Sequence, residues 1–136
     1  MTILPLLLSL LTVPVSVDAS MYVSLATAIE AQERPALWHA IHEVECSGLT
    51  ICGRSHSGAC CPLQVLGGRY GNPPCALLEA SPWLCVVSAD RQMERCRRMC
   101  GRSRAVGCYH TGGCGGSPEY ERRVNAAVVA AQRRGE

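Results

Sequence analysis

Phenylalanine and lysine are absent from this chain of 136 residues, and only two tryptophans and four tyrosines are present. With so few large side chains the chain can build only a modest core, so covalent cross-links should help to keep it folded. The formal net charge of +2 suits mild attraction to an anionic polymer. No basic run with interleaved aromatics appears, which argues against nucleic acid as a partner.

The one long apolar run lies in the first nineteen residues, MTILPLLLSLLTVPVSVDA. It is short for a membrane-spanning helix and is interrupted by Pro5 and Pro14. It has the character of a secretory signal with a small-residue cleavage site after Val17-Asp18-Ala19, and it holds no cysteine for lipid attachment. We therefore predict a signal peptide over residues 1–19, no stable membrane span after its removal, and a secreted or periplasmic location.

Cysteine is abundant, and an even number behind a secretion signal predicts a disulfide framework of up to five bridges. The ten are Cys46, Cys52, Cys60, Cys61, Cys75, Cys85, Cys96, Cys100, Cys108 and Cys114. Their pairing is left open by the sequence. The alternative is a zinc site, with ligands drawn from Cys96, Cys100, Cys108, His110 and Cys114. Because thiols in an oxidising compartment usually pair, we expect disulfides, no metal and no cofactor.

Apolar residues recur at helical spacing in three segments, which predicts helices over residues 36–46, 88–99 and 119–133. Pro35 and Pro118 stand where helices begin, and Gly48 and Gly101 stand where they end. Clusters of small and turn-forming residues predict loops over residues 49–75 and 111–118. We expect one mainly α domain over residues 36–136, small and stapled by disulfides, behind a lead-in segment over residues 20–35 that forms a helix. We expect a monomer.

Three short segments, in this order, resemble motifs of the lytic transglycosylases and goose-type lysozymes. They are AIHEVEC over residues 40–46, SGACCPLQV over 57–65 and CYHTGG over 108–113. That family has a helix ending Val-Glu-Ser, then Gly-Ala-x-Gly-Leu-Met-Gln, then Ala-Tyr-Asn-x-Gly, and a closing helix like the one after Pro118, where Tyr120 and Val124 fit the pattern. The chain departs from these motifs at Cys46, Cys61, Pro62, Cys108 and His110.

The resemblance implies a lysozyme-like fold and cleavage of the β-1,4 bond between N-acetylmuramic acid and N-acetylglucosamine in peptidoglycan glycan strands. One glutamate, matching Glu45, would protonate the glycosidic oxygen and then deprotonate the C6 hydroxyl of the sugar, leaving a 1,6-anhydro end. The helical period agrees, because Glu45 lies one turn beyond Ile41 at the helix exit, whereas Glu43 is rotated by about 200° and should face water. The alternative is that both glutamates are solvated helix charges.

The resemblance also implies a set of substrate-binding residues. Gln64 would bind substrate or brace the cleft, and Tyr109 would hold Glu45 or the sugar through its hydroxyl. His110 stands where the family has a substrate-contacting asparagine. Gly58 and Gly112 would let the backbone approach the glycan.

Other residues carry competing interpretations. Hydrolysis with inversion would need a second carboxylate, for which Glu79 and Asp90 are available. Trp38, Tyr70 and Trp83 are either sugar-stacking surfaces or, for the two tryptophans, part of the core. The same polymer, or chitin, would be the substrate of a hydrolysing lysozyme or chitinase. The replacements at Cys61 and His110 also permit a catalytically inactive peptidoglycan-binding module or inhibitor on the same scaffold.

Overall fold

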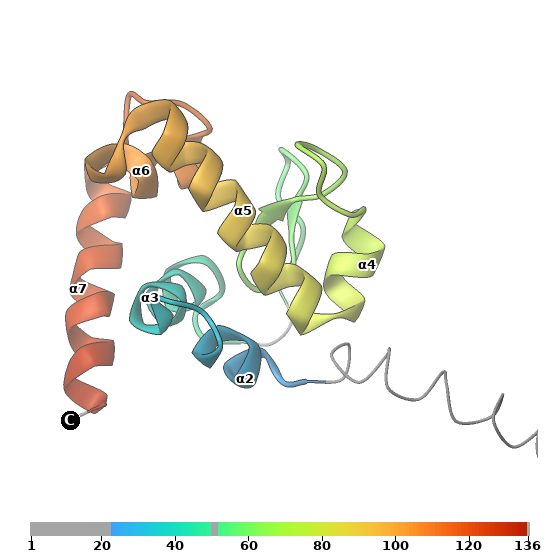
Figure 1. Cartoon of the computed structure of the whole chain (residues 1–136), viewed down its shortest axis with the longest axis horizontal. Coiled ribbons are helices and arrows are strands. Elements are labelled where there is room, and N and C mark those ends of the chain that lie inside the picture. The colour runs from blue at the N-terminus through green and yellow to red at the C-terminus, as the bar shows by residue number, and fades with distance from the viewer. Residues whose placement is uncertain (1–22, 50–51, 136) are drawn as a thin grey trace, which may run out of the picture.

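The computed structural model describes residues 23–49 and 52–135, and the predicted signal peptide over residues 1–19 lies outside this part. The fold is mainly α, as predicted. Its elements are α2 (Leu25–Glu30), α3 (Pro35–Cys46), β1 (Ala59–Cys60), β2 (Val65–Leu66), α4 (Cys75–Ala80), α5 (Pro82–Cys100), the 3-10 helix η2 (Arg102–Arg104), α6 (Ala105–Thr111) and α7 (Pro118–Arg134). Long α5 crosses the molecule from α4 to α6, and α7 runs alongside α3 (Figure 1).

The predicted helices begin and end for local reasons. α3 begins with Pro35 and ends where Ser47 adopts a left-handed conformation, at φ 51°. The Ser81 hydroxyl accepts a hydrogen bond from the Leu84 amide and caps α5, whose end is marked by Gly101 at φ 81°. α5 therefore starts at Pro82, six residues before the predicted boundary.

The lead-in segment belongs to the same core as the rest of the domain. It forms a helix as expected, α2, which buries Leu25, Ala28 and Ile29 and contacts both α3 and α5. Trp38 on α3 is only 1 % exposed and meets the ring of Tyr109 edge-on, with centroids 5.7 Å apart. Trp38 is therefore a core residue.

The segment predicted as loop over residues 49–75 contains a two-stranded antiparallel hairpin. β1 and β2 pair through Ala59 with Leu66 and Cys60 with Val65. Strands of two residues are too short to produce a period-two pattern in the sequence. The helices α4 and α6 were not predicted either. Because α6 extends to Thr111, the predicted loop over 111–118 shortens to 112–117.

All ten cysteines pair, which confirms the disulfide framework. The bridges are Cys46–Cys52, Cys60–Cys75, Cys61–Cys85, Cys96–Cys108 and Cys100–Cys114, with Cα atoms 5.3–6.2 Å apart. The four cysteines of the zinc alternative thus pair with one another. So many disulfides in a small domain are typical of an oxidising compartment. In the described part of the chain, no helix has both the length and the apolar character needed to cross a membrane.

Candidate active site

The last turn of α3 presents two glutamates in different ways. Glu43 is exposed, whereas the side chain of Glu45 is only 15 % exposed. The chain then leaves the helix through Ser47, and the Cys46–Cys52 bridge ties the helix end to the segment that follows. The orientation predicted from the helical period is therefore confirmed.

Glu45 lies at a cleft of about 360 Å³, within the range of small-molecule sites. The walls come from the end of α3, the loops around the hairpin, α5 and α6. The lining residues are Glu45, Ser55, Ser57, Ala59, Gln64, Leu66, Arg69, Tyr70, Gln92, Tyr109, His110, Thr111 and Gly112. The three motif segments, far apart in sequence, thus meet here. Among these described lining residues, Glu45 is the only carboxylate.

His110 stands on the solvent side of Glu45. Its Nδ1 lies 3.6 Å from Glu45 Oε1, and its side chain is 45 % exposed. At this distance a protonated imidazole forms an ion pair with the Glu45 carboxylate. The residue at the family's asparagine position therefore contacts the candidate acid directly.

Tyr120, from the first turn of α7, is buried next to His110. Its ring stacks on His110, with centroids 4.1 Å apart and planes 7° from parallel. Within the described residues its buried hydroxyl has no hydrogen-bond partner. Burial, and after it the negative charge of Glu45, raises the pKa of Tyr120 far above its usual value. Its phenol is therefore protonated at neutral pH and lies near the Glu45 carboxyl group.

Tyr109 is fully buried, and its hydroxyl donates to the carbonyl oxygen of Leu63 at 2.6 Å. Burial, with a smaller effect of the Glu45 charge, raises the pKa of Tyr109 well above its usual value. This hydrogen bond therefore joins the segment over residues 108–113 to the segment over residues 57–65. A contact of Tyr109 with the sugar stays a prediction.

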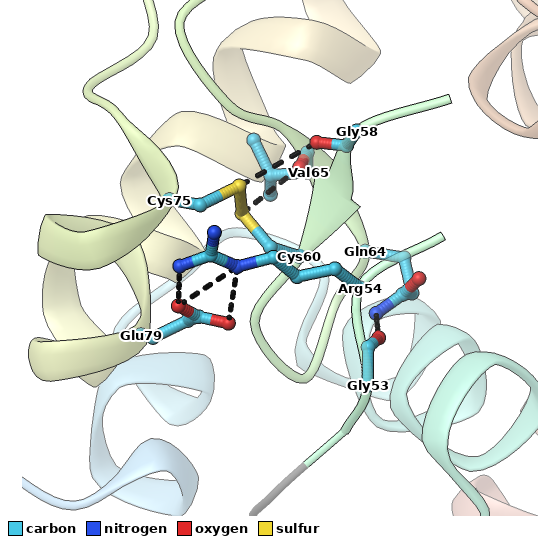
Figure 2. Close-up of polar contacts among 8 residues, drawn as sticks. All are labelled: Gly53, Arg54, Gly58, Cys60, Gln64, Val65, Cys75 and Glu79. Atoms are coloured by element: carbon cyan, nitrogen blue, oxygen red, sulfur yellow. Dashed lines mark hydrogen bonds and ion pairs between the residues drawn. A yellow bond between two sulfur atoms is a disulfide. The ribbon is translucent and has the colours of Figure 1, made fainter. Parts of the chain in front are cut away.

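Gln64 lines the cleft and braces the segment before the hairpin. Its Nε2 donates to the carbonyl oxygen of Gly53 at 3.2 Å (Figure 2). It also donates to the carbonyl oxygen of Cys61 at 3.1 Å. Gly112 ends α6 at φ 82° and lies in the cleft wall, where a side chain would be strained. Gly58, at φ 88°, lies in the turn before β1 and does not itself line the cleft.

In the described part of the chain, neither candidate for a second carboxylate lies in the Glu45 cleft. Glu79 is held by Arg54, whose Nη2 lies 2.6 Å from Glu79 Oε1 (Figure 2). This hydrogen-bonded guanidinium lowers the pKa of Glu79. Asp90 lines a different groove, beside Arg97 and Arg102. Neither Glu79 nor Asp90 lines the Glu45 cleft.

Sequence reasoning missed a buried amide pair behind the cleft. Gln92 Oε1 accepts from the Leu66 amide at 3.2 Å and from Asn72 Nδ2 at 3.5 Å, and Asn72 Nδ2 also donates to the Leu66 carbonyl at 3.0 Å. These bonds fasten β2 and the following loop to α5. The sequence feature that could have revealed this pair is the position of Gln92, which lies beside Ala89 and Met93 on the apolar face of a predicted helix.

Within residues 23–49 and 52–135, no three His, Cys, Asp or Glu side chains gather where they could hold a metal ion. The titratable groups that line the cleft are the partly buried carboxyl group of Glu45, the phenols of Tyr70 and Tyr109, the imidazole of His110 and the guanidinium of Arg69. No protein-family model, curated protein or solved structure matches this chain.

Proposed function

We propose that the protein is a peptidoglycan lytic transglycosylase that cuts the bond between N-acetylmuramic acid and N-acetylglucosamine, with Glu45 as general acid and base. The observation that supports this best is the single, partly buried carboxylate in the cleft where the three motif segments meet. The proposal rests on this arrangement and on the motif resemblance.

The reaction would use the Glu45 carboxyl group twice. As an acid it gives its proton to the glycosidic oxygen, so that the bond to the anomeric carbon breaks through an oxocarbenium-like transition state. As a carboxylate it then accepts the proton of the C6 hydroxyl on the same sugar. The C6 oxygen bonds to the anomeric carbon and gives the 1,6-anhydro end, while Glu45 regains its proton without any water being consumed.

The absence of a second carboxylate in the described cleft wall favours this route over hydrolysis with inversion. An inverting enzyme places a catalytic base about 6.5–9.5 Å from the acid to activate water. Glu79 is occupied by Arg54, and Asp90 faces another groove. A single carboxyl group is sufficient for the intramolecular route.

One contact favours a second candidate function, a catalytically inactive peptidoglycan-binding module. His110 Nδ1 lies 3.6 Å from Glu45 Oε1, so the imidazole competes with a substrate oxygen for the candidate acid. The two candidates therefore differ in one measurable property, which is whether glycan strands are cut.

The test is a digest of purified peptidoglycan by the oxidised protein, with products identified by mass spectrometry. We expect 1,6-anhydro muropeptides from the wild type and from Glu43→Gln, and none from Glu45→Gln. Glu43→Gln is the matched control, because it makes the same change two residues away on the exposed side of α3.

Other outcomes would redirect the proposal. Reducing-end products that depend on Glu45 would mean hydrolysis, with a retaining or inverting mechanism to be separated by product stereochemistry. No product from folded wild type, together with cosedimentation on insoluble wall, would refute the enzyme and support the binding module. His110→Asn then shows whether the imidazole is responsible, since it removes the ring that lies beside Glu45.

A further inference from the structure

The loop between β2 and α4 carries an exposed aromatic residue at the edge of the Glu45 cleft. Tyr70 is 53 % exposed and adopts a left-handed φ of 54°, which is strained for a non-glycine residue. The loop around it is pinned, because Gly68 N donates to Pro73 O at 3.0 Å and Asn72 N donates to Arg69 O at 2.8 Å. Tyr70 is therefore held outward by the surrounding structure.

Arginines surround this tyrosine. The Cζ atom of Arg95, on α5, lies 3.8 Å from the centre of the Tyr70 ring, a close cation–π contact. Arg91, one turn earlier on α5, donates to Gly71 O at 3.4 Å, and exposed Arg69 lines the cleft itself. We name Arg69, Arg91 and Arg95 the arginine ledge.

The positive charge of the arginine ledge is not neutralised by the described part of the protein. No carboxylate there lies within ion-pair distance of its three guanidinium groups, whereas Arg54, Arg97, Arg98 and Arg122 each have a glutamate partner. Arg104 and Arg123 are likewise without such a partner among the described residues, so the ledge is distinguished by its place beside the Glu45 cleft. Of the two acidic residues of α5, Glu94 is already bound by Arg97 and Arg98, which lower its pKa, and Asp90 lines a different groove. The ledge is thus an electropositive surface with donors free for an outside anion.

The arginine ledge also lies between the Glu45 cleft and a second groove. Tyr70 lines the Glu45 cleft, and Arg95 on its ring lines a neighbouring groove of about 550 Å³ together with Arg91, Glu94, Arg98 and Met99. A ligand that leaves the cleft over Tyr70 therefore enters a groove with basic walls. Such a path suits a polymer that is neutral where it is cut and acidic in its branches.

We propose that the arginine ledge binds the carboxylate groups of the peptide stems carried by the N-acetylmuramic acid units. This inference rests on the proposed function and names the part of the substrate that the cleft alone does not recognise. Guanidinium groups pair with carboxylates through two parallel hydrogen bonds, a geometry that favours arginine over lysine. The ledge would thereby favour glycan strands that still bear stems over strands from which an amidase has removed them.

The experiment compares soluble glycan strands with stems and the same strands after amidase treatment, both stripped of phosphate-containing wall polymers. For Arg91→Gln/Arg95→Gln we expect KM on stemmed strands to rise on the order of tenfold, because an exposed arginine–carboxylate pair contributes up to about fivefold. The kcat and the KM on bare strands should not change, because neither of these arginines lines the Glu45 cleft. Arg122→Gln is the matched control, since it removes one exposed arginine from α7, where it pairs with Glu119.

Salt provides a second readout. The preference of the wild type for stemmed strands should shrink as ionic strength rises, and the double variant should show little preference at any salt concentration. Equal KM values of wild type and double variant on stemmed strands would overturn the proposal, as would equal losses on both substrates. The Arg95 substitution removes the contact with the Tyr70 ring. Circular dichroism of the double variant is therefore needed to establish that it is folded.

Failure of the proposed function would be recognised separately. If no 1,6-anhydro product forms from either substrate, cosedimentation with insoluble stemmed and bare wall still tests the ledge. Preferential binding to the stemmed wall, lost in the double variant and kept in Arg122→Gln, would support the ledge on a non-catalytic protein. Equal binding to both walls would refute it.

Discussion

The two buried tyrosines of the candidate site should respond in opposite directions to loss of their hydroxyl groups. Tyr109 and Tyr120 are both buried beside Glu45, yet only the Tyr109 hydroxyl has a partner, the Leu63 carbonyl at 2.6 Å. Tyr109→Phe leaves that buried carbonyl unpaired, so we expect a loss of about 1–3 kcal/mol in the free energy of unfolding. Tyr120→Phe removes a buried hydroxyl that gains no hydrogen bond, so we expect a rise of about 1 kcal/mol.

Both substitutions keep the ring contacts, so the two variants can be compared for loss of the hydroxyl group alone. Phenylalanine keeps the edge-on contact of residue 109 with Trp38 and the stack of residue 120 on His110. At neutral pH both phenols are protonated, because burial raises the pKa of each, so no charge changes on substitution. The difference between the two variants should reach about 2 kcal/mol or more, which corresponds to a Tm difference of roughly 8 °C.

The assay is thermal or urea unfolding of the oxidised proteins, followed by circular dichroism. Destabilisation of similar size in both variants would refute the reasoning, because it would mean that the Tyr120 hydroxyl also makes a stabilising hydrogen bond.

Two further predictions concern alkaline pH and close packing. Because the folded state raises the pKa of Tyr109 and Tyr120, stability should be fully present below about pH 10 and fall above it, with two phenols ionising only on unfolding. Ionisation of every tyrosine in a protein that keeps its ellipticity, measured by phenolate absorbance, would contradict this. Gly107→Ala should destabilise by about 1–3 kcal/mol in thermal unfolding, because the new Cβ would lie 2.9 Å from the Gly116 Cα, whereas Gly113→Ala, with nothing within 4 Å, should change stability by less than about 0.5 kcal/mol.

The sequence predicted helices where a polar face contrasts with an apolar one. α3 and α7 have such faces and begin at prolines, so their limits were found to within one residue. The first turns of α5 were missed, because Cys85 and Val86 are fully buried and Trp83 and Leu84 partly so, which leaves no periodic contrast. α6 was missed because seven residues that include Gly107 give too little pattern.

From the sequence, only those features of the candidate site that depend on a single helix could be predicted. The helical period was enough to separate Glu45 from Glu43, since both lie on one helix. The Tyr109–Leu63 hydrogen bond and the stack of Tyr120 on His110 join residues from different elements, so they depend on how helices pack. The cysteine pairing depends on the same packing, and nothing in the spacing selects it.

The position of the disulfides along the chain divides the domain into a cross-linked part and a part held by packing alone. Every disulfide lies between residues 46 and 114, so no disulfide joins α7 to the rest of the domain. α7 is instead fixed by buried residues such as Tyr120 and Val124, which pack against its neighbours. Undocking α7 therefore costs less than unravelling the cross-linked centre. Since α7 packs along α3, which carries Glu45, the cleft would lose its shape in a state that retains most of its helices. If the proposed function is correct, warming should end catalysis before it melts the fold.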